Sequence, residues 1–148
     1  MKRIGMPPRV AYPRASQWHD TGPLTATKLL VLTRDNYSCV CCGRAIYGQQ
    51  YSIQHVKRRS QGGTNTVTNL ITLLGTGITA CHGRIDSRVD PRDEYRGYTV
   101  RSWGDPAVTP MWLVTGFGSR WVLRLPDGTY EDADPPEGRH PLMPQRPR

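Results

Sequence analysis

The chain has 148 residues, which suits one domain with short extensions and argues against a multidomain protein. Apolar residues make up 36% of the sequence, and no segment approaches the ~20 apolar residues of a membrane-spanning helix, so no membrane partner is expected. Twenty Lys and Arg residues against twelve Asp and Glu give a net charge of +8, which favours a polyanionic partner such as nucleic acid.

The first third of the chain predicts a basic arm, a helix, a turn and a strand. Residues 1–25 carry four prolines among Lys and Arg side chains, a composition typical of an extended arm. They lack the apolar run of a signal peptide, so we expect a cytoplasmic protein, in the host cell if a phage encodes it. Leucines at helical spacing predict a helix over residues 26–36, and a tight turn follows at 39–43. Alternating side chains predict a strand over residues 51–55.

The middle of the chain predicts a loop, a second strand and a second helix. Residues 57–66 form a basic loop in which a glycine pair is expected to act as a hinge. An apolar run predicts a strand over residues 70–74, and a glycine turn follows it. Residues 80–89 predict a helix, which Pro91 is expected to end.

The last third of the chain predicts a small β appendage over residues 96–131. Its strand-like segments are residues 98–102, 111–114 and 121–125. The proline-rich residues 132–148 are typical of a disordered tail. The four tryptophans are expected to pack in the core or the appendage, in preference to stacking on nucleobases. They are Trp18, Trp103, Trp112 and Trp121.

Charge and cysteine are both concentrated in the middle of the chain. Residues 36–85 contain no Asp or Glu, which favours a surface for a phosphate backbone, with a solvated loop as the alternative. The positive residues of this stretch are Arg44, Lys57, Arg58, Arg59 and Arg84. Three of the four cysteines crowd into residues 39–42, a spacing that suits a zinc knuckle better than a disulfide framework.

Five short motifs follow one another in the same stretch. They are Cys39-x-x-Cys42, Gln54-His55, Gly62-Gly63, Asn69-Leu70 and Cys81-His82. In this order and spacing they resemble the HNH endonuclease family, most closely the small HNH proteins of actinobacterial phages, over residues 26–125. The segments QHVKRRSQGG, CHGRI and GYTVRSWGDP extend the likeness. The resemblance implies an α+β fold: a ββα-metal (His-Me finger) core at residues 26–95 with a cysteine zinc knuckle.

The resemblance also implies roles for individual residues in phosphodiester hydrolysis. His55 would be the general base, Asn69 would brace the loop that presents it, and His82 would bind the catalytic metal ion. The residues that would hold DNA phosphates are Lys57, Arg58, Arg59 and Arg84. The simpler alternatives are an ordinary strand histidine at His55, a turn cap at Asn69, and a zinc-binding role for His82.

Two positions depart from the family pattern, and the first is Gln54. The family often has Asp or His there as the second ligand of the catalytic metal ion. Gln54 and His82 offer neutral donors, so we expect Mn²⁺, Co²⁺, Ni²⁺ or Zn²⁺ to be favoured over Mg²⁺. Water, phosphate or a distant carboxylate such as Asp86 would complete the coordination.

The second departure concerns the structural zinc ion. Cys39, Cys42 and Cys81 supply three thiolates, but Leu74 stands where the phage relatives place another cysteine. The fourth ligand would be Cys41, a histidine or water. The alternative is that no zinc binds and that the cysteines pack as small hydrophobic residues.

Sequence and resemblance together indicate a metal-dependent endonuclease that nicks or cuts DNA. In the phage relatives such proteins are encoded near packaging genes, which implies genome processing and packaging proteins as partners. The first rival is a zinc-knuckle nucleic-acid-binding protein without catalysis. The second is an assembly protein that docks a partner through the β appendage.

Overall fold

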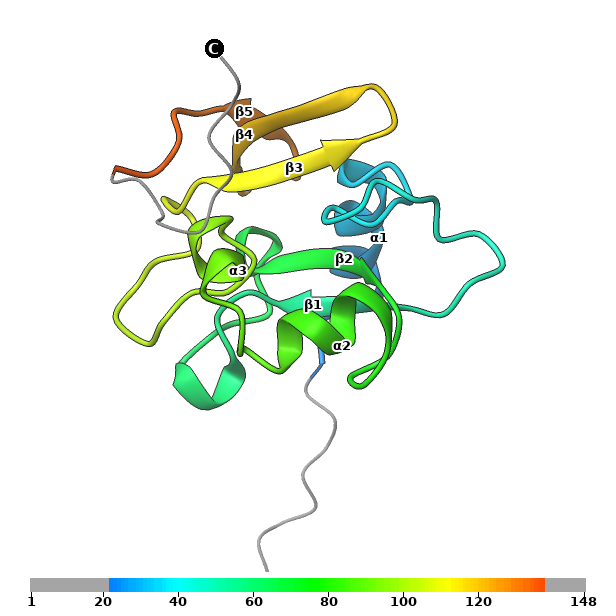
Figure 1. Cartoon of the computed structure of the whole chain (residues 1–148), viewed down its shortest axis with the longest axis horizontal. Coiled ribbons are helices and arrows are strands. Elements are labelled where there is room, and N and C mark those ends of the chain that lie inside the picture. Colours follow the sequence, from blue (N-terminus) through cyan, green and yellow to red (C-terminus); the bar gives the residue numbers. More distant parts are fainter. Residues whose placement is uncertain (1–21, 138–148) are drawn as a thin grey trace, which may run out of the picture.

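The computed structural model describes residues 22–137 and has a mixed α+β fold with two small antiparallel sheets (Figure 1). In chain order the elements are α1 (Thr25–Arg34), β1 (Tyr51–His55), η1 (Arg59–Gln61), η2 (Val67–Asn69), β2 (Leu70–Leu74), α2 (Ala80–Asp86), α3 (Pro91–Tyr95), β3 (Met111–Thr115), β4 (Gly118–Arg124) and β5 (Tyr130–Asp132). Most of the expected basic arm and tail, together with Trp18, lies outside the described residues. None of the described helices is long and apolar enough to cross a bilayer.

Strands β1 and β2 form an antiparallel ribbon that is covered on both faces. Side chains alternate between the faces of a strand, so Ile53 and Leu70 meet Val31 of α1 on one face. On the other face, Ile71 and Leu73 pack with residues of the main core, including Ile85 of α2. Helix α2 contacts both strands. The elements follow the predicted order of strand, loop, strand and helix.

The C-terminal sheet, in the order β3-β4-β5, lies across the top of the ribbon in Figure 1. Met111 and Leu113 of β3 and Val122 of β4 belong to the same hydrophobic cluster as Val40 and Ile85. The described C-terminal strands thus share one core with the rest of the chain and do not form a separately packed appendage.

Three details of the predicted C-terminal half are wrong. Residues 98–102 form no strand. They are an irregular segment whose Tyr98 and Val100 side chains are buried in the main hydrophobic core. The helix over residues 80–89 already ends at Asp86, and Pro91 begins α3, where its missing N–H costs nothing. Strand β5, beyond the turn at residues 126–128, was not predicted.

A buried polar network joins α1 to both sheets. The Asp35 carboxylate accepts hydrogen bonds from the Arg34 guanidinium at 2.7 Å, the Thr72 backbone N–H at 2.8 Å and the Tyr130 hydroxyl at 2.5 Å. The side chains of Arg34 and Asp35 are fully buried, and Arg34 also donates to the Leu70 carbonyl at 2.7 Å. This network fixes the start of β2, which immediately follows the loop that carries the candidate site.

We expect Asp35→Asn to lower the free energy of unfolding by about 2–3 kcal/mol, because the buried Arg34 loses its charged hydrogen-bond partner. Chemical denaturation would measure the loss. The matched control is Asp132→Asn, which removes an ion pair between exposed side chains with Arg120 and should change stability by less than about 1 kcal/mol. Equal effects of the two variants would mean that the network does not stabilise the fold.

Candidate functional site

Strand β1 and helix α2 bring Gln54, His82 and Asp86 together. Gln54 lies on the face of β1 that meets α2, and His82 and Asp86 are four residues apart on one side of the helix. Gln54 Oε1 accepts a hydrogen bond from His82 Nε2 at 2.6 Å, and Gln54 Nε2 donates to Asp86 Oδ1 at 3.3 Å. The two residues predicted to bind the catalytic metal ion are thus neighbours, and a carboxylate adjoins them.

The donor atoms of this group include nitrogen and oxygen atoms that could bind a metal ion. They are an imidazole nitrogen, an amide oxygen and a carboxylate oxygen, a mixed set that suits Mn²⁺, Co²⁺ or Ni²⁺ better than Mg²⁺. Because the Gln54 oxygen only accepts, His82 Nε2 carries the proton in this arrangement. His82 Nδ1 is buried and has no hydrogen-bond partner among the described residues, so the ring has an unused lone pair.

His55 follows Gln54 directly and lies at the end of β1. Its Nε2 is 2.8 Å from Asn65 Oδ1, which only accepts, so Nε2 carries the proton and Nδ1 keeps a lone pair. That is the tautomer in which the ring can take a proton at Nδ1. Sequence reasoning missed Asn65, and the only signal for it was an amide residue in the loop that follows His55.

Asn69 is buried and holds the loop that follows His55. Its Oδ1 accepts from the Lys57 backbone N–H at 2.8 Å, while Nδ2 donates to the carbonyls of Lys57 at 3.0 Å and Thr64 at 2.8 Å. The expected hinge is instead a close-packed turn, because a Cβ on Gly63 would overlap the Lys57 carbonyl oxygen. The loop is thereby tied at both ends to one amide side chain.

Two basic residues of the loop, Lys57 and Arg58, make weak or neutral contacts. Lys57 Nζ donates to the Gly104 carbonyl at 3.1 Å. Arg58 contacts the backbone carbonyl of Asp86 and pairs with its carboxylate at 3.4 Å, with both side chains about two-fifths exposed. Arg59 is exposed at the start of η1. Since exposed ion pairs are weak, Arg58 can exchange its carboxylate for a phosphate at small cost.

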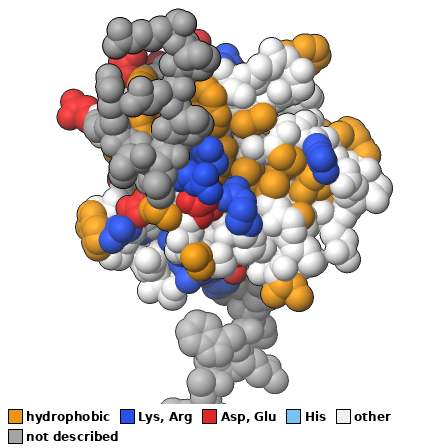
Figure 2. Space-filling view, in the orientation of Figure 1, with side chains coloured by type: hydrophobic (Ala, Val, Ile, Leu, Met, Phe, Trp, Pro, Cys, Tyr) orange, Lys and Arg blue, Asp and Glu red, His pale blue; other side chains and the backbone are white. Residues whose placement is uncertain are grey.

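Arg84 does not join this group. Its guanidinium donates to both carboxylate oxygens of Asp93, at 2.5 and 2.6 Å, and to Cys41 Sγ at 3.1 Å. The Asp93 side chain is fully buried, so the charge of Arg84 is already compensated. The face that α2 and α3 present in Figure 1 accordingly shows blue side chains interleaved with red ones (Figure 2). We therefore leave Arg84 out of the candidate phosphate-binding surface.

The cysteines form a second cluster beside α2. The Sγ atoms of Cys39, Cys42 and Cys81 all lie within 4.8 Å of one another, and this trio could hold a metal ion. All four cysteines are free thiols. Burial raises the pKa of Cys81, and the neighbouring thiols raise it further, so binding of a cation would release protons from the cluster.

The neighbours of this cysteine trio limit the choice of a fourth ligand. Leu74 is buried in the core and paired with Tyr51, where it contributes packing. Cys41 adjoins Cys81 closely enough for each thiol to affect the pKa of the other, and its sulfur accepts a hydrogen bond from Arg84. Of the ligands considered from the sequence, Cys41 thus adjoins Cys81, but its sulfur is not one of the three that converge.

Comparison of the chain with protein-family models, with curated proteins and with solved structures finds no match. The functional assignment therefore depends on the residues and their geometry. Among the described residues, the cysteine trio is the one group of three Cys, His, Asp or Glu side chains whose ligand atoms converge. The Gln54–His82 pair includes an amide and so forms a different kind of candidate site.

Proposed function

We propose that this protein is a metal-dependent endonuclease of the HNH type that hydrolyses DNA phosphodiester bonds. The main support is the contact between Gln54 and His82, because two residues that are separated by a loop and a strand, and that are predicted to bind the same metal ion, lie side by side. His55 adjoins this pair in the chain, and Asn69 braces the loop between them. A zinc knuckle alone would not require these four residues to be arranged in this way.

His55 would act as the general base in hydrolysis. Its Nδ1 takes a proton from a water molecule, while Asn65 holds the opposite nitrogen in the donor state. The water oxygen forms a bond to phosphorus as the bond from phosphorus to the leaving sugar oxygen breaks, and solvent protonates that oxygen. A divalent ion bound by Gln54 and His82 would supply Lewis acidity at the phosphate.

The scissile phosphate would lie along the open edge of β1. This strand pairs only with β2 among the described residues, so its other edge has no strand partner. Consecutive residues of a strand point to opposite faces, so Gln54 and His55 lie on the two sides of this edge. A phosphate at the edge would be approached by both side chains, and Arg58 would bind its charge.

We expect faster plasmid nicking with Mn²⁺, Co²⁺ or Ni²⁺ than with Mg²⁺ at equal concentration, because Gln54 and His82 are neutral donors. Gln54→Asp should shift the preference toward Mg²⁺, since it adds an anionic ligand beside Asp86. The matched control is Gln49→Asp, which adds the same charge at an exposed position outside the site. A wild-type preference for Mg²⁺ that Gln54→Asp leaves unchanged would show that residue 54 is not a ligand.

A nucleic-acid-binding protein without catalysis is the second candidate. The cysteine trio supports it, because a zinc knuckle can organise a basic surface without any active site. This candidate predicts that the protein binds DNA and cleaves it with none of the four metal ions.

A further inference from the structure

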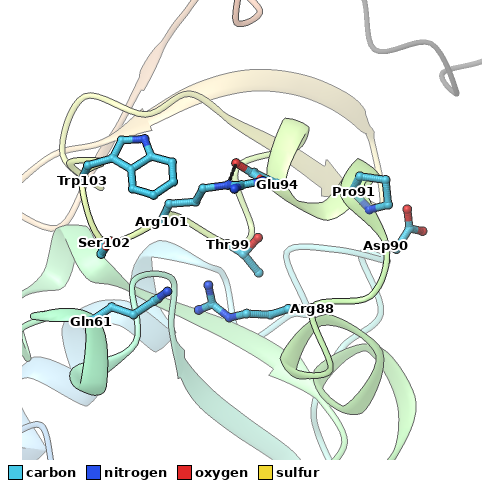
Figure 3. A pocket seen from close by; sticks show the side chains of 9 residues that line it. All are labelled: Gln61, Arg88, Asp90, Pro91, Glu94, Thr99, Arg101, Ser102 and Trp103. Carbon is cyan, nitrogen blue, oxygen red and sulfur yellow. Dashed lines mark hydrogen bonds and ion pairs between the residues drawn. The ribbon is translucent and has the colours of Figure 1, made fainter.

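A cavity of about 280 Å³ lies between the loop that follows His55 and the segment after α3. Gln61 and Arg88 form one side, and Arg101 and Trp103 stand on the other, with open space between them (Figure 3). The proposed reaction uses none of these four residues.

Trp103 is the unusual member of this cavity, because 79% of its surface is exposed. The expectation that the tryptophans pack in the core is wrong for this residue. Trp112 and Trp121 do pack, with ring centroids 5.3 Å apart. The Arg101 guanidinium lies over the Trp103 ring at 5.3 Å and is held by Glu94 at 2.6 Å. A large aromatic ring is thus presented to solvent at the edge of a polar cavity.

The opposite side of the cavity carries unused hydrogen-bonding atoms. Gln61 Oε1 and Arg88 Nε are both buried and have no hydrogen-bond partner among the described residues. One is an acceptor and the other a donor. The carboxylates of the cavity already have partners, since Glu94 pairs with Arg101 and Asp90 pairs with Arg92. Arg88 forms no ion pair within the described chain, so the free positive charge of the cavity is on this side.

The cavity adjoins the candidate active site. Arg88 donates to the Val56 carbonyl at 3.1 Å, one residue after His55. Arg88 follows Asp86 by two residues, and Asp86 pairs with Arg58 at 3.4 Å. Gln61 lies on the same loop as Arg58. A group bound in the cavity would therefore lie beside a phosphate held by Arg58.

We propose that this cavity receives an unpaired nucleobase of the DNA strand, with Trp103 as its stacking platform. A nucleobase combines a flat aromatic face, which an exposed indole binds by stacking, with donors and acceptors along its edge. The edge would face the side of the cavity that Gln61 and Arg88 form, and the backbone phosphate would meet the basic loop. The preferred substrate is then DNA with an unpaired base beside the cleaved bond. This substrate preference rests on the proposed nuclease function, whereas the base-binding site does not.

Binding is tested with the full-length His55→Ala protein without added divalent metal, so that no cleavage occurs. The probes are a paired duplex, the same duplex with one bulged 2-aminopurine, and a free deoxynucleoside monophosphate. We expect tighter binding of the bulged duplex and quenching of its fluorescence. Adding Trp103→Ala should weaken that binding roughly 5- to 100-fold, the usual worth of one stacked base, and abolish the quenching. Trp103→Phe should retain most of the affinity.

The matched control is Phe117→Ala, which removes another fully exposed aromatic ring, outside the cavity. It should leave the binding of all probes unchanged. The proposal would be overturned if the His55→Ala protein bound the bulged duplex equally well with and without Trp103→Ala. It would also be overturned if Trp103→Ala weakened the binding of paired and bulged DNA to the same extent. Displacement of the bulged probe by micromolar free nucleotide would also overturn it, because the cavity would then be a mononucleotide site.

Cleavage assays separate this proposal from the proposed function. If the wild-type protein cleaves no DNA but Trp103→Ala loses the preference for the bulged duplex, the base-binding site stands and the nuclease assignment fails. If the protein cleaves paired and bulged DNA equally and Trp103→Ala changes neither rate, the nuclease assignment stands and the base-binding site fails.

Discussion

His55→Ala should slow DNA cleavage by ~10²–10⁴-fold, the usual contribution of a general base. DNA affinity and stability should stay close to the wild-type values. The reason is that His55 is only half-buried and its ring is hydrogen-bonded to the Asn65 side chain, so little packing is lost. Single-turnover rates with saturating protein would measure the effect, because they separate the chemical step from DNA binding.

Two controls make the His55→Ala result specific. Tyr51→Ala changes an exposed side chain at the other end of the same strand and should leave the rate within about twofold. Imidazole in the buffer should restore part of the activity of His55→Ala, because it can replace the missing base. A variant that keeps near wild-type turnover would show that His55 is not the base.

Loss of a zinc ion from the cysteine trio should have the largest effect on stability. We expect one zinc ion per chain, and we expect Cys42→Ala to lose it and to lower the free energy of unfolding by several kcal/mol. In zinc-finger peptides the binding of structural zinc is worth about 10–16 kcal/mol, and a ligand-deficient site keeps only part of it. The core of this protein is small, so it has little other stabilisation to compensate.

Elemental analysis and chemical denaturation would measure zinc content and stability together. Val40→Ala is the matched control, because Val40 is buried beside Cys39 but offers no ligand. It should lower stability through lost packing and keep the zinc ion. Cys41→Ala should lower the affinity for zinc if Cys41 is the fourth ligand. A zinc-free wild-type protein whose stability Cys42→Ala leaves unchanged would mean that the cysteines serve only as small core residues.

Local sequence patterns predicted the part of the fold that depends on local physics. The strands at residues 51–55 and 70–74 follow from alternation and from an apolar run, and both are observed. The segment around Tyr98 and Val100 has a strand-like sequence, but the fold buries Tyr98, Thr99 and Val100 together without pairing them in a sheet. The sequence pattern could not distinguish a buried irregular segment from a strand.

Long-range contacts were beyond the reach of sequence reasoning. The charge pattern suggested a phosphate-binding role for Arg84, but the fold buries Asp93 against its guanidinium. In the sequence Asp86 is a distant carboxylate, and the fold brings it to Gln54. The sequence signal for this placement is that Asp86 follows His82 by four residues on a predicted helix, so both lie on one side of it. Asn65 gave no such signal, because the conformation of its loop decides which side chain reaches His55.

The most direct test of the account is relaxation of supercoiled plasmid by wild-type protein and by His55→Ala, purified in parallel, with Mn²⁺ or with EDTA. The account predicts nicked or linear plasmid from the wild-type protein with Mn²⁺ alone, and almost none from His55→Ala at the same concentration. Equal cleavage by the two proteins would remove His55 from the chemistry. Absence of cleavage by the wild-type protein with Mn²⁺, Co²⁺, Ni²⁺ and Mg²⁺, despite DNA binding, would contradict the nuclease assignment and leave the zinc-knuckle binding protein.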